Sequence, residues 1–119
     1  MTETQALTAL SALSQETRLR IVRLLVTAGP DGMVAGAIGE ELEAASSRLS
    51  FHLTHLEHAG LIQSRREGRS IRYTAAYDAL SGLIAFLMRD CCQGRPEVCA
   101  PAVEAVAACA CSTTEAGHA

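Results

Sequence analysis

One stretch of the chain, SSRLSFHLTHLEHAGLIQSRREGRSIRY at 46–73, constrains the fold more than any other segment. Leu49, Leu53 and Leu56 recur at the spacing of one helical face, which predicts an amphipathic helix that buries its leucines. The serines that open the stretch favour a helix N-terminus there. Gly60 then supplies the residue that best tolerates the left-handed conformation in which many helices end. The stretch therefore begins with a helix whose two ends are both marked in the sequence.

A β-hairpin is predicted directly after this helix. Two short runs, 61–66 and 70–74, flank the turn Glu67-Gly68-Arg69, and this pattern predicts two strands joined by a glycine-containing loop. A helix that stops at glycine and leads into an arginine-tipped hairpin is typical of the recognition helix and wing of a winged helix-turn-helix. The alternative is a helix and hairpin whose polar face is merely solvated.

The distribution of charge favours a nucleic-acid-binding interpretation. Residues 46–72 contain five arginines and two glutamates, a local net charge of +3, whereas the whole chain carries −3. A DNA footprint needs only a local basic patch, and arginine can bind phosphate or a guanine edge bidentately. We therefore predict that the helix and wing bind double-stranded DNA. The candidate contact residues are Ser47, Arg48, Ser50, Phe51, His52, Thr54, Arg65, Arg66 and Arg69.

Two of these residues have alternative interpretations. His52 borders the leucine face and can either pack in the interior or hydrogen-bond a phosphate. Phe51 lies on the outward face, where it can touch a thymine methyl group or pack against the preceding helix. His52, His55 and His58 are spaced at i, i+3 and i+6, but we expect ordinary packing and solvent exposure rather than a metal site.

Further helices are predicted on both sides of this stretch. Residues 4–13 carry leucines and alanines in one apolar stripe, and a second helix is expected to begin with Ser14 as its cap. The run 29–32 predicts a turn, and 33–43 predicts a short positioning helix. A last helix, capped by Asp78, places apolar side chains on one face, namely Leu80, Leu83, Ile84, Leu87 and Met88.

This is more apolar helix surface than one small winged domain can cover. We therefore expect the first and last helices to pair across a two-fold axis in a homodimer. A simple intramolecular core is the alternative. The predicted fold class is mainly α with a small β-hairpin (α+β), a winged helix-turn-helix in a helical homodimer. Residues 1–92 would form the DNA-binding and dimerisation domain, and 93–119 a cysteine-containing tail.

The hydropathy pattern and the cysteine count indicate the cellular compartment. No apolar run is long enough to span a bilayer and the first residues lack a signal segment, so we expect a cytoplasmic protein with no membrane partner. Five cysteines are an odd number for a disulfide framework. In a reducing compartment they are candidate metal ligands or redox sensors.

Three of the cysteines form the best candidate sensor site. Cys91 and Cys92 are adjacent near the end of the last predicted helix, and Cys99 follows beyond a Gly-Arg-Pro turn. Three thiolates make a soft site. Zinc normally adds a fourth ligand, whereas trivalent arsenic or antimony takes three sulfurs, so the count favours a metalloid. Cys109 and Cys111 are a weaker candidate pair, and incidental thiols are the alternative.

The strings SRLSFHLTHLEHAGLI and RREGRSIRY resemble the DNA-binding core of the ArsR/SmtB family of bacterial metal-sensing repressors, and LSQETRLRIVRLL resembles the second helix of that family. The matching segments cover residues 7 to 88. The resemblance implies a homodimeric repressor of operator DNA rather than an enzyme. The thiol pair that many arsenic and cadmium sensors carry in the positioning helix is absent from 33–43.

A vicinal cysteine pair followed by a third cysteine is similar to the C-terminal site of one arsenic-responsive branch of this family. That similarity implies Cys91, Cys92 and Cys99 as ligands of arsenic(III), the inducer, with antimonite or methylarsenite as related possibilities. The alternatives are a zinc- or cadmium-type repressor, a repressor triggered by thiol oxidation, and a metalloid-binding protein that does not bind DNA.

Overall fold

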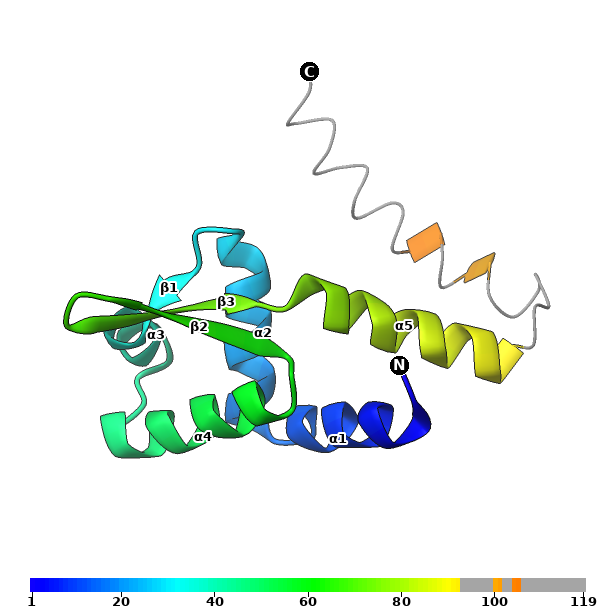
Figure 1. Cartoon of the computed structure of the whole chain (residues 1–119), viewed down its shortest axis with the longest axis horizontal. Coiled ribbons are helices and arrows are strands. Elements are labelled where there is room, and N and C mark those ends of the chain that lie inside the picture. The colour runs from blue at the N-terminus through cyan, green and yellow to red at the C-terminus, as the bar shows by residue number, and fades with distance from the viewer. Residues whose placement is uncertain (93–99, 102–103, 106–119) are drawn as a thin grey trace, which may run out of the picture. The chain divides into compact units, whose positions relative to one another are not determined.

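The computed structural model describes residues 1–92, 100–101 and 104–105, with side chains placed up to residue 88 and again at 100–101 and 104–105 (Figure 1). Residues Met1–Leu83 group into one compact unit and Ile84–Ala119 into a second. The winged helix-turn-helix lies within the first unit. No helix in the described ranges is both long enough and apolar enough to cross a membrane.

The order of elements agrees with the predicted class, since helices dominate and a small sheet includes the predicted hairpin. The helix predicted from the leucine spacing and the hairpin after it are both present. The elements are α1 (Glu3–Leu13), α2 (Glu16–Ala28), β1 (Met33–Val34), α3 (Ala35–Leu42), α4 (Ser46–His58), β2 (Ile62–Glu67), β3 (Ser70–Ala75) and α5 (Tyr77–Cys92).

The sheet has three antiparallel strands in the order β1-β3-β2, one more than predicted. Met33 and Val34, predicted as the start of a helix, are instead extended and pair with Tyr73 and Arg72 of β3. Gly32 explains how the chain reaches β3 so closely. Its φ is +64°, and a Cβ atom at this position would collide with the backbone carbonyl oxygen of Tyr73. Only glycine combines that conformation with that approach.

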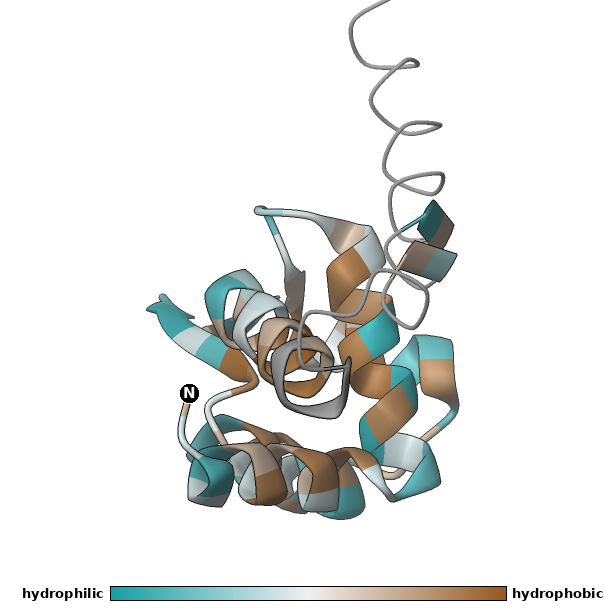
Figure 2. Cartoon of the chain, turned by 90° about the vertical axis from the view of Figure 1, so that its right-hand side faces the viewer, coloured by the Kyte–Doolittle hydropathy of each residue, from teal (hydrophilic) through white to brown (hydrophobic). Residues whose placement is uncertain are grey.

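The core lies between α2, α3, α4 and the start of β2. Removing a large aliphatic side chain from water contributes about 1.5–3 kcal/mol each, so this cluster is the main source of stability for the unit. Coloured by hydropathy, the helices show apolar and polar segments alternating along their length, as two-sided helices should (Figure 2). The fully buried large side chains are Ile21, Leu25, Ile38, Leu53, Leu56, Leu61 and Ile62.

Helix α1 packs within the unit through its alanines and not through its leucines. Its inward residues are three alanines at i, i+3 and i+6, all nearly inaccessible, whereas Leu7 is 62% exposed and Leu10 39%. The small alanine side chains allow α1 to pack closely against α2 and α4. A capping box holds its first turn, with the Thr2 hydroxyl accepting from the Gln5 amide and the Gln5 side chain accepting from the Thr2 amide. The leucines are thereby left on the outer side of the helix.

Candidate nucleic-acid interface

Helix α4 is bounded by two backbone features. At its start, Glu43 adopts a left-handed conformation (φ 52°) that ends α3 and turns the chain into α4. At its end, Gly60 has φ +81°, the Gly60 amide donates to the carbonyl of Glu57, and the Leu61 amide donates to the carbonyl of Leu56 at 3.1 Å. These bonds satisfy carbonyls that a helix end otherwise leaves open. The predicted serine cap is wrong, because Ala45 occupies the N-cap position and no side chain caps the helix.

The two faces of α4 differ sharply in exposure. Leu49, Leu53 and Leu56 are at most 4% exposed, which confirms the predicted buried stripe. Five of the six predicted DNA-contacting residues of this helix are solvent-exposed and therefore accessible to a partner. They are Ser47, Arg48, Ser50, Phe51 and Thr54.

His52 is the exception, because its side chain is buried. Its side chain is 6% exposed, and its Nδ1 lies 3.2 Å from Nη1 of Arg18. A guanidinium can only donate, so Nδ1 must accept and the imidazole is the neutral Nε2–H tautomer. Burial, followed by the positive charges of Arg18 and Arg48, lowers the pKa of His52. His52 is thus packed in the interior, which is the first of its two predicted alternatives.

Arg18 is a structural residue that sequence reasoning did not identify. An arginine of α2 could be expected to bind phosphate or to form a salt bridge with Glu16. Instead, the Nε of Arg18 donates to the carbonyl of Ala12 at 2.7 Å while its Nη1 bonds His52, so that it links α1, α2 and α4. It is Arg20, one turn after Glu16, that forms the salt bridge with the Glu16 carboxylate, at 2.8 Å.

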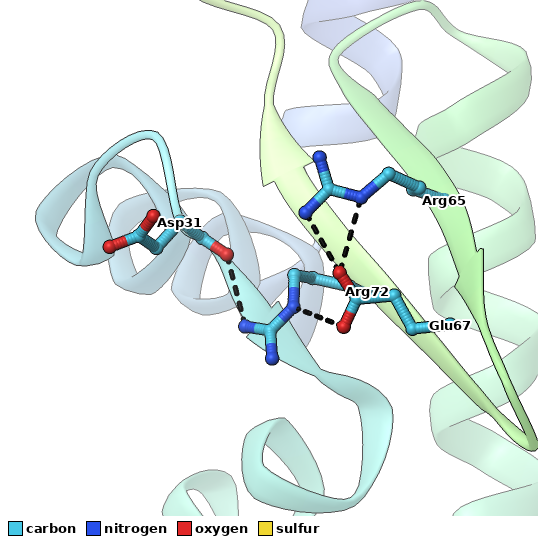
Figure 3. A network of polar contacts seen from close by, with 4 residues as sticks. All are labelled: Asp31, Arg65, Glu67 and Arg72. Carbon is cyan, nitrogen blue, oxygen red and sulfur yellow. Dashed lines mark hydrogen bonds and ion pairs between the residues drawn. The ribbon is translucent and has the colours of Figure 1, made fainter.

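The wing contains an ion-pair network centred on Glu67 (Figure 3). Oε2 of Glu67 accepts from Nη2 and Nε of Arg65 at 2.9 and 3.2 Å, and Oε1 accepts from Nε of Arg72 at 2.9 Å. Arg72 also donates from Nη1 to the carbonyl of Asp31 at 3.0 Å, which fastens the hairpin to the loop before β1. Hydrogen bonds from Arg72 and Arg65 lower the pKa of Glu67. The carboxylate thus separates two arginines that face each other across β2 and β3.

The other two wing arginines have no such partner within the described part of the chain. Arg66 pairs with Ile71 across the strands, so it shares a sheet face with Ser64 and Tyr73. Ser64 donates to Glu57 of α4 at 2.6 Å, which identifies this face as the one toward the recognition helix. Arg69 occupies the two-residue loop between Glu67 and Ser70. Both guanidinium groups are exposed and available to an anion.

The predicted thiol site falls on residues whose side chains the structure does not describe. Cys91 and Cys92 are the last two residues of α5, and their side chains, like all of Cys99, lie outside the described residues. Cys109 and Cys111 lie outside them as well. Elsewhere, within the ranges that the structure does describe, no group of three or more His, Cys, Asp or Glu side chains is arranged to hold a metal.

Known proteins share both the sequence pattern and this geometry. A family model described as a helix-turn-helix domain matches residues 13–65. The transcriptional activator HlyU of Vibrio cholerae is 32% identical over 89 residues, which cover 75% of this chain and 80% of HlyU. A putative arsenical resistance operon repressor, ArsR of Halobacterium salinarum, is 38% identical over 73 residues, 60% of this chain and 56% of that protein.

Similarity to solved structures agrees with the sequence matches. An ArsR-like transcriptional regulator from Rhodococcus sp. RHA1 superposes with a TM-score of 0.68 at 27% identity, covering 87% of this chain and 93% of the other. These proteins are transcription regulators rather than enzymes. The match to HlyU over most of both sequences, together with the exposed face of α4 and the arginine-bearing wing, shows that the chain belongs to the ArsR/SmtB family of winged helix-turn-helix transcriptional regulators.

Proposed function

We propose that this regulator is a cytoplasmic repressor that binds operator DNA as a homodimer and releases it when trivalent arsenic binds Cys91, Cys92 and Cys99. The observation that carries the DNA-binding part is the division of α4 into a buried leucine face and an exposed polar face. Beside it stand two wing arginines that have no ion-pair partner among the described residues. A helix held rigidly from behind can present its outer side chains to base edges without first becoming ordered.

In this proposal α4 lies in the major groove and the wing lies against the backbone. Arg66 and Arg69 bind phosphate or enter the minor groove, and Arg65 adds a weaker phosphate contact because Glu67 already balances part of its charge. Two recognition helices of a dimer would occupy half-sites about 34–36 Å apart, one turn of DNA. The base-edge readers are the exposed residues of α4, namely Ser47, Arg48, Ser50, Phe51 and Thr54.

The exposed leucines of α1 support a homodimer. Leu7 and Leu10 project from a helix whose opposite side is already packed, so they offer an apolar strip to a second copy of the chain. A two-fold dimer buries the same strip from both subunits and matches the symmetry of a palindromic operator.

The inducer is inferred from thiol chemistry and from one relative. Three cysteines close in sequence supply the soft ligands that trivalent arsenic prefers, and the related protein of Halobacterium salinarum is described as a putative arsenical resistance repressor. A coupling free energy of about 1–3 kcal/mol between inducer and DNA would weaken binding about 5–150-fold. Nearly complete release would need about 5.5 kcal/mol.

The test is a DNA-binding titration of the reduced full-length protein. An operator is first selected from random double-stranded DNA, and its affinity is followed by fluorescence anisotropy with arsenite, zinc or an oxidant added. We expect arsenite to release DNA from the wild type and from a Cys109→Ser/Cys111→Ser control, but not from Cys91→Ser/Cys92→Ser. Release by zinc alone or by oxidant alone would replace arsenic with a divalent metal or a disulfide as the trigger. Failure to bind any DNA would overturn the whole proposal.

A further inference from the structure

Phe51 is the most exposed large apolar side chain in the described part of the chain, at 64%. It is surrounded along α4 by Ser47, Ser50 and Thr54, all polar and all exposed. The interior does not need it, because the leucines of α4 already fill the buried face. The ring is therefore open to a binding partner, and burying it there would remove a large apolar surface from water without disturbing the core.

The ring is held in place from two sides. Its centroid lies 5.4 Å from that of His52 at an interplanar angle of 64°, and 6.3 Å from that of His55 at 78°, both edge-to-face arrangements. His52 is itself fixed by its hydrogen bond with Arg18. These contacts favour one orientation of the Phe51 ring, which lowers the entropy cost of ordering it when a partner binds.

The major groove offers few apolar groups to such a ring. Base edges there present hydrogen-bond donors and acceptors, which phenylalanine cannot use, and the C5-methyl group of thymine, which it can. We infer that Phe51 is a specificity-determining residue that contacts the C5-methyl group of one thymine in each operator half-site. This inference rests on the proposed DNA-binding function and adds the chemical group that α4 recognises.

Deoxyuridine differs from thymidine only by that methyl group, so it provides a direct test. In an operator selected with the wild-type protein, each thymine is replaced in turn by deoxyuridine and the affinity is measured at fixed salt. We expect one thymine per half-site whose replacement weakens wild-type binding roughly fourfold, the loss expected for one buried methyl group. Phe51→Ala should bind thymine and deoxyuridine operators equally, whereas Phe51→Leu should keep part of the preference.

The outcomes separate this inference from the function on which it rests. If the protein binds the selected operator but no thymine is sensitive to deoxyuridine, the methyl contact is wrong and operator binding stands. The same conclusion follows if Phe51→Ala retains the full thymine preference. His58→Ala, an exposed substitution on the same helix, serves as the matched control and should behave as the wild type. If no operator is bound at all, both the inference and the proposed function fail.

Discussion

The recognition helix and the wing are adjacent in sequence, yet different forces hold them in place. Helix α4 is fixed by leucines that are almost fully buried, together with the His52–Arg18 bond behind it. The β2–β3 hairpin beyond Ser64 is largely exposed and is held by the charges around Glu67 and by the bond from Arg72 to the loop before β1. Truncating a buried leucine to alanine costs about 2–5 kcal/mol of stability, whereas an exposed ion pair contributes about 0–1 kcal/mol. We therefore expect α4 to keep its conformation and the wing to change its conformation more readily when the protein binds DNA.

The largest effect on stability is expected at the buried face of α4. Leu53→Ala removes a side chain that is 1% exposed and leaves a cavity between α4 and the core. We expect the free energy of unfolding to fall by about 2–5 kcal/mol, measured by urea denaturation. Thr54→Ala, exposed on the neighbouring position, should change it by less than about 0.5 kcal/mol. Equal effects of the two substitutions would contradict the two-faced description of α4.

A smaller loss is expected at the base of the wing. Gly32→Ala places a Cβ against the carbonyl of Tyr73 in a left-handed conformation, and should destabilise the protein by about 1–3 kcal/mol. Gly36→Ala is the matched control, because no atom lies within 4 Å of its added Cβ and the site is helical. It should be neutral or stabilising by up to about 1 kcal/mol. Thermal unfolding measures the stability of both variants. Equal stabilities would contradict the requirement for glycine at the close approach to β3.

The wing arginines should differ among themselves in DNA binding. The slope of log affinity against log salt decreases by about 0.9 for each phosphate that the protein no longer neutralises. Removing Arg66 or Arg69 should therefore lower the slope by about two per dimer, whereas removing Arg65, which is paired with Glu67, should lower it less. Salt titrations of the three alanine variants on one operator measure this. Identical slopes for all three variants would show that the ion pair with Glu67 does not reduce the contribution of Arg65 to phosphate binding.

The effect of pH on stability should be the smallest and should arise at His52. Because the pKa of His52 is lowered in the fold, the unfolded chain takes up a proton that the folded chain resists. The contribution is therefore fully present above the unfolded pKa of about 6.5 and is lost as the pH falls below that value. Urea midpoints between about pH 5 and pH 7.5 should decline toward acid in the wild type and in His58→Gln. In His52→Gln the decline should be shallower.

The parts of this fold that depend on local pattern were predictable from the sequence. The spacing of Leu49, Leu53 and Leu56 identified the buried face of α4, and the turn at Gly68 identified the hairpin. Both signals arise from residues within a few positions of one another. The exposed set on α4 followed from the same helical period. For His52 two alternatives stayed open, because it lies at the edge of the leucine stripe, where a single period cannot decide burial.

The remaining features depend on contacts between distant residues. Strand β1 forms because Met33 pairs with Tyr73 of β3. The hydrogen bond from Arg72 to the carbonyl of Asp31 likewise joins residues 41 positions apart. No periodicity within either segment records such a pairing. In α1 the sequence showed one apolar stripe but could not tell which of its members pack within the unit, because that depends on how closely the neighbouring helices approach: the alanines fill the inner side and the leucines lie on the outer one. The thiol site stays a prediction, because its side chains lie outside the described residues.

Glu67 has a consequence for how the protein moves through the cell's DNA. The hairpin carries its own counterion, so one of its four positive charges is already neutralised before any phosphate arrives. Fewer small ions are then displaced when the protein meets an arbitrary duplex, and chance encounters hold it less tightly. In the proposed mode of binding, such a regulator would spend less of its time on non-operator DNA, and discrimination would rest on the exposed side chains of α4.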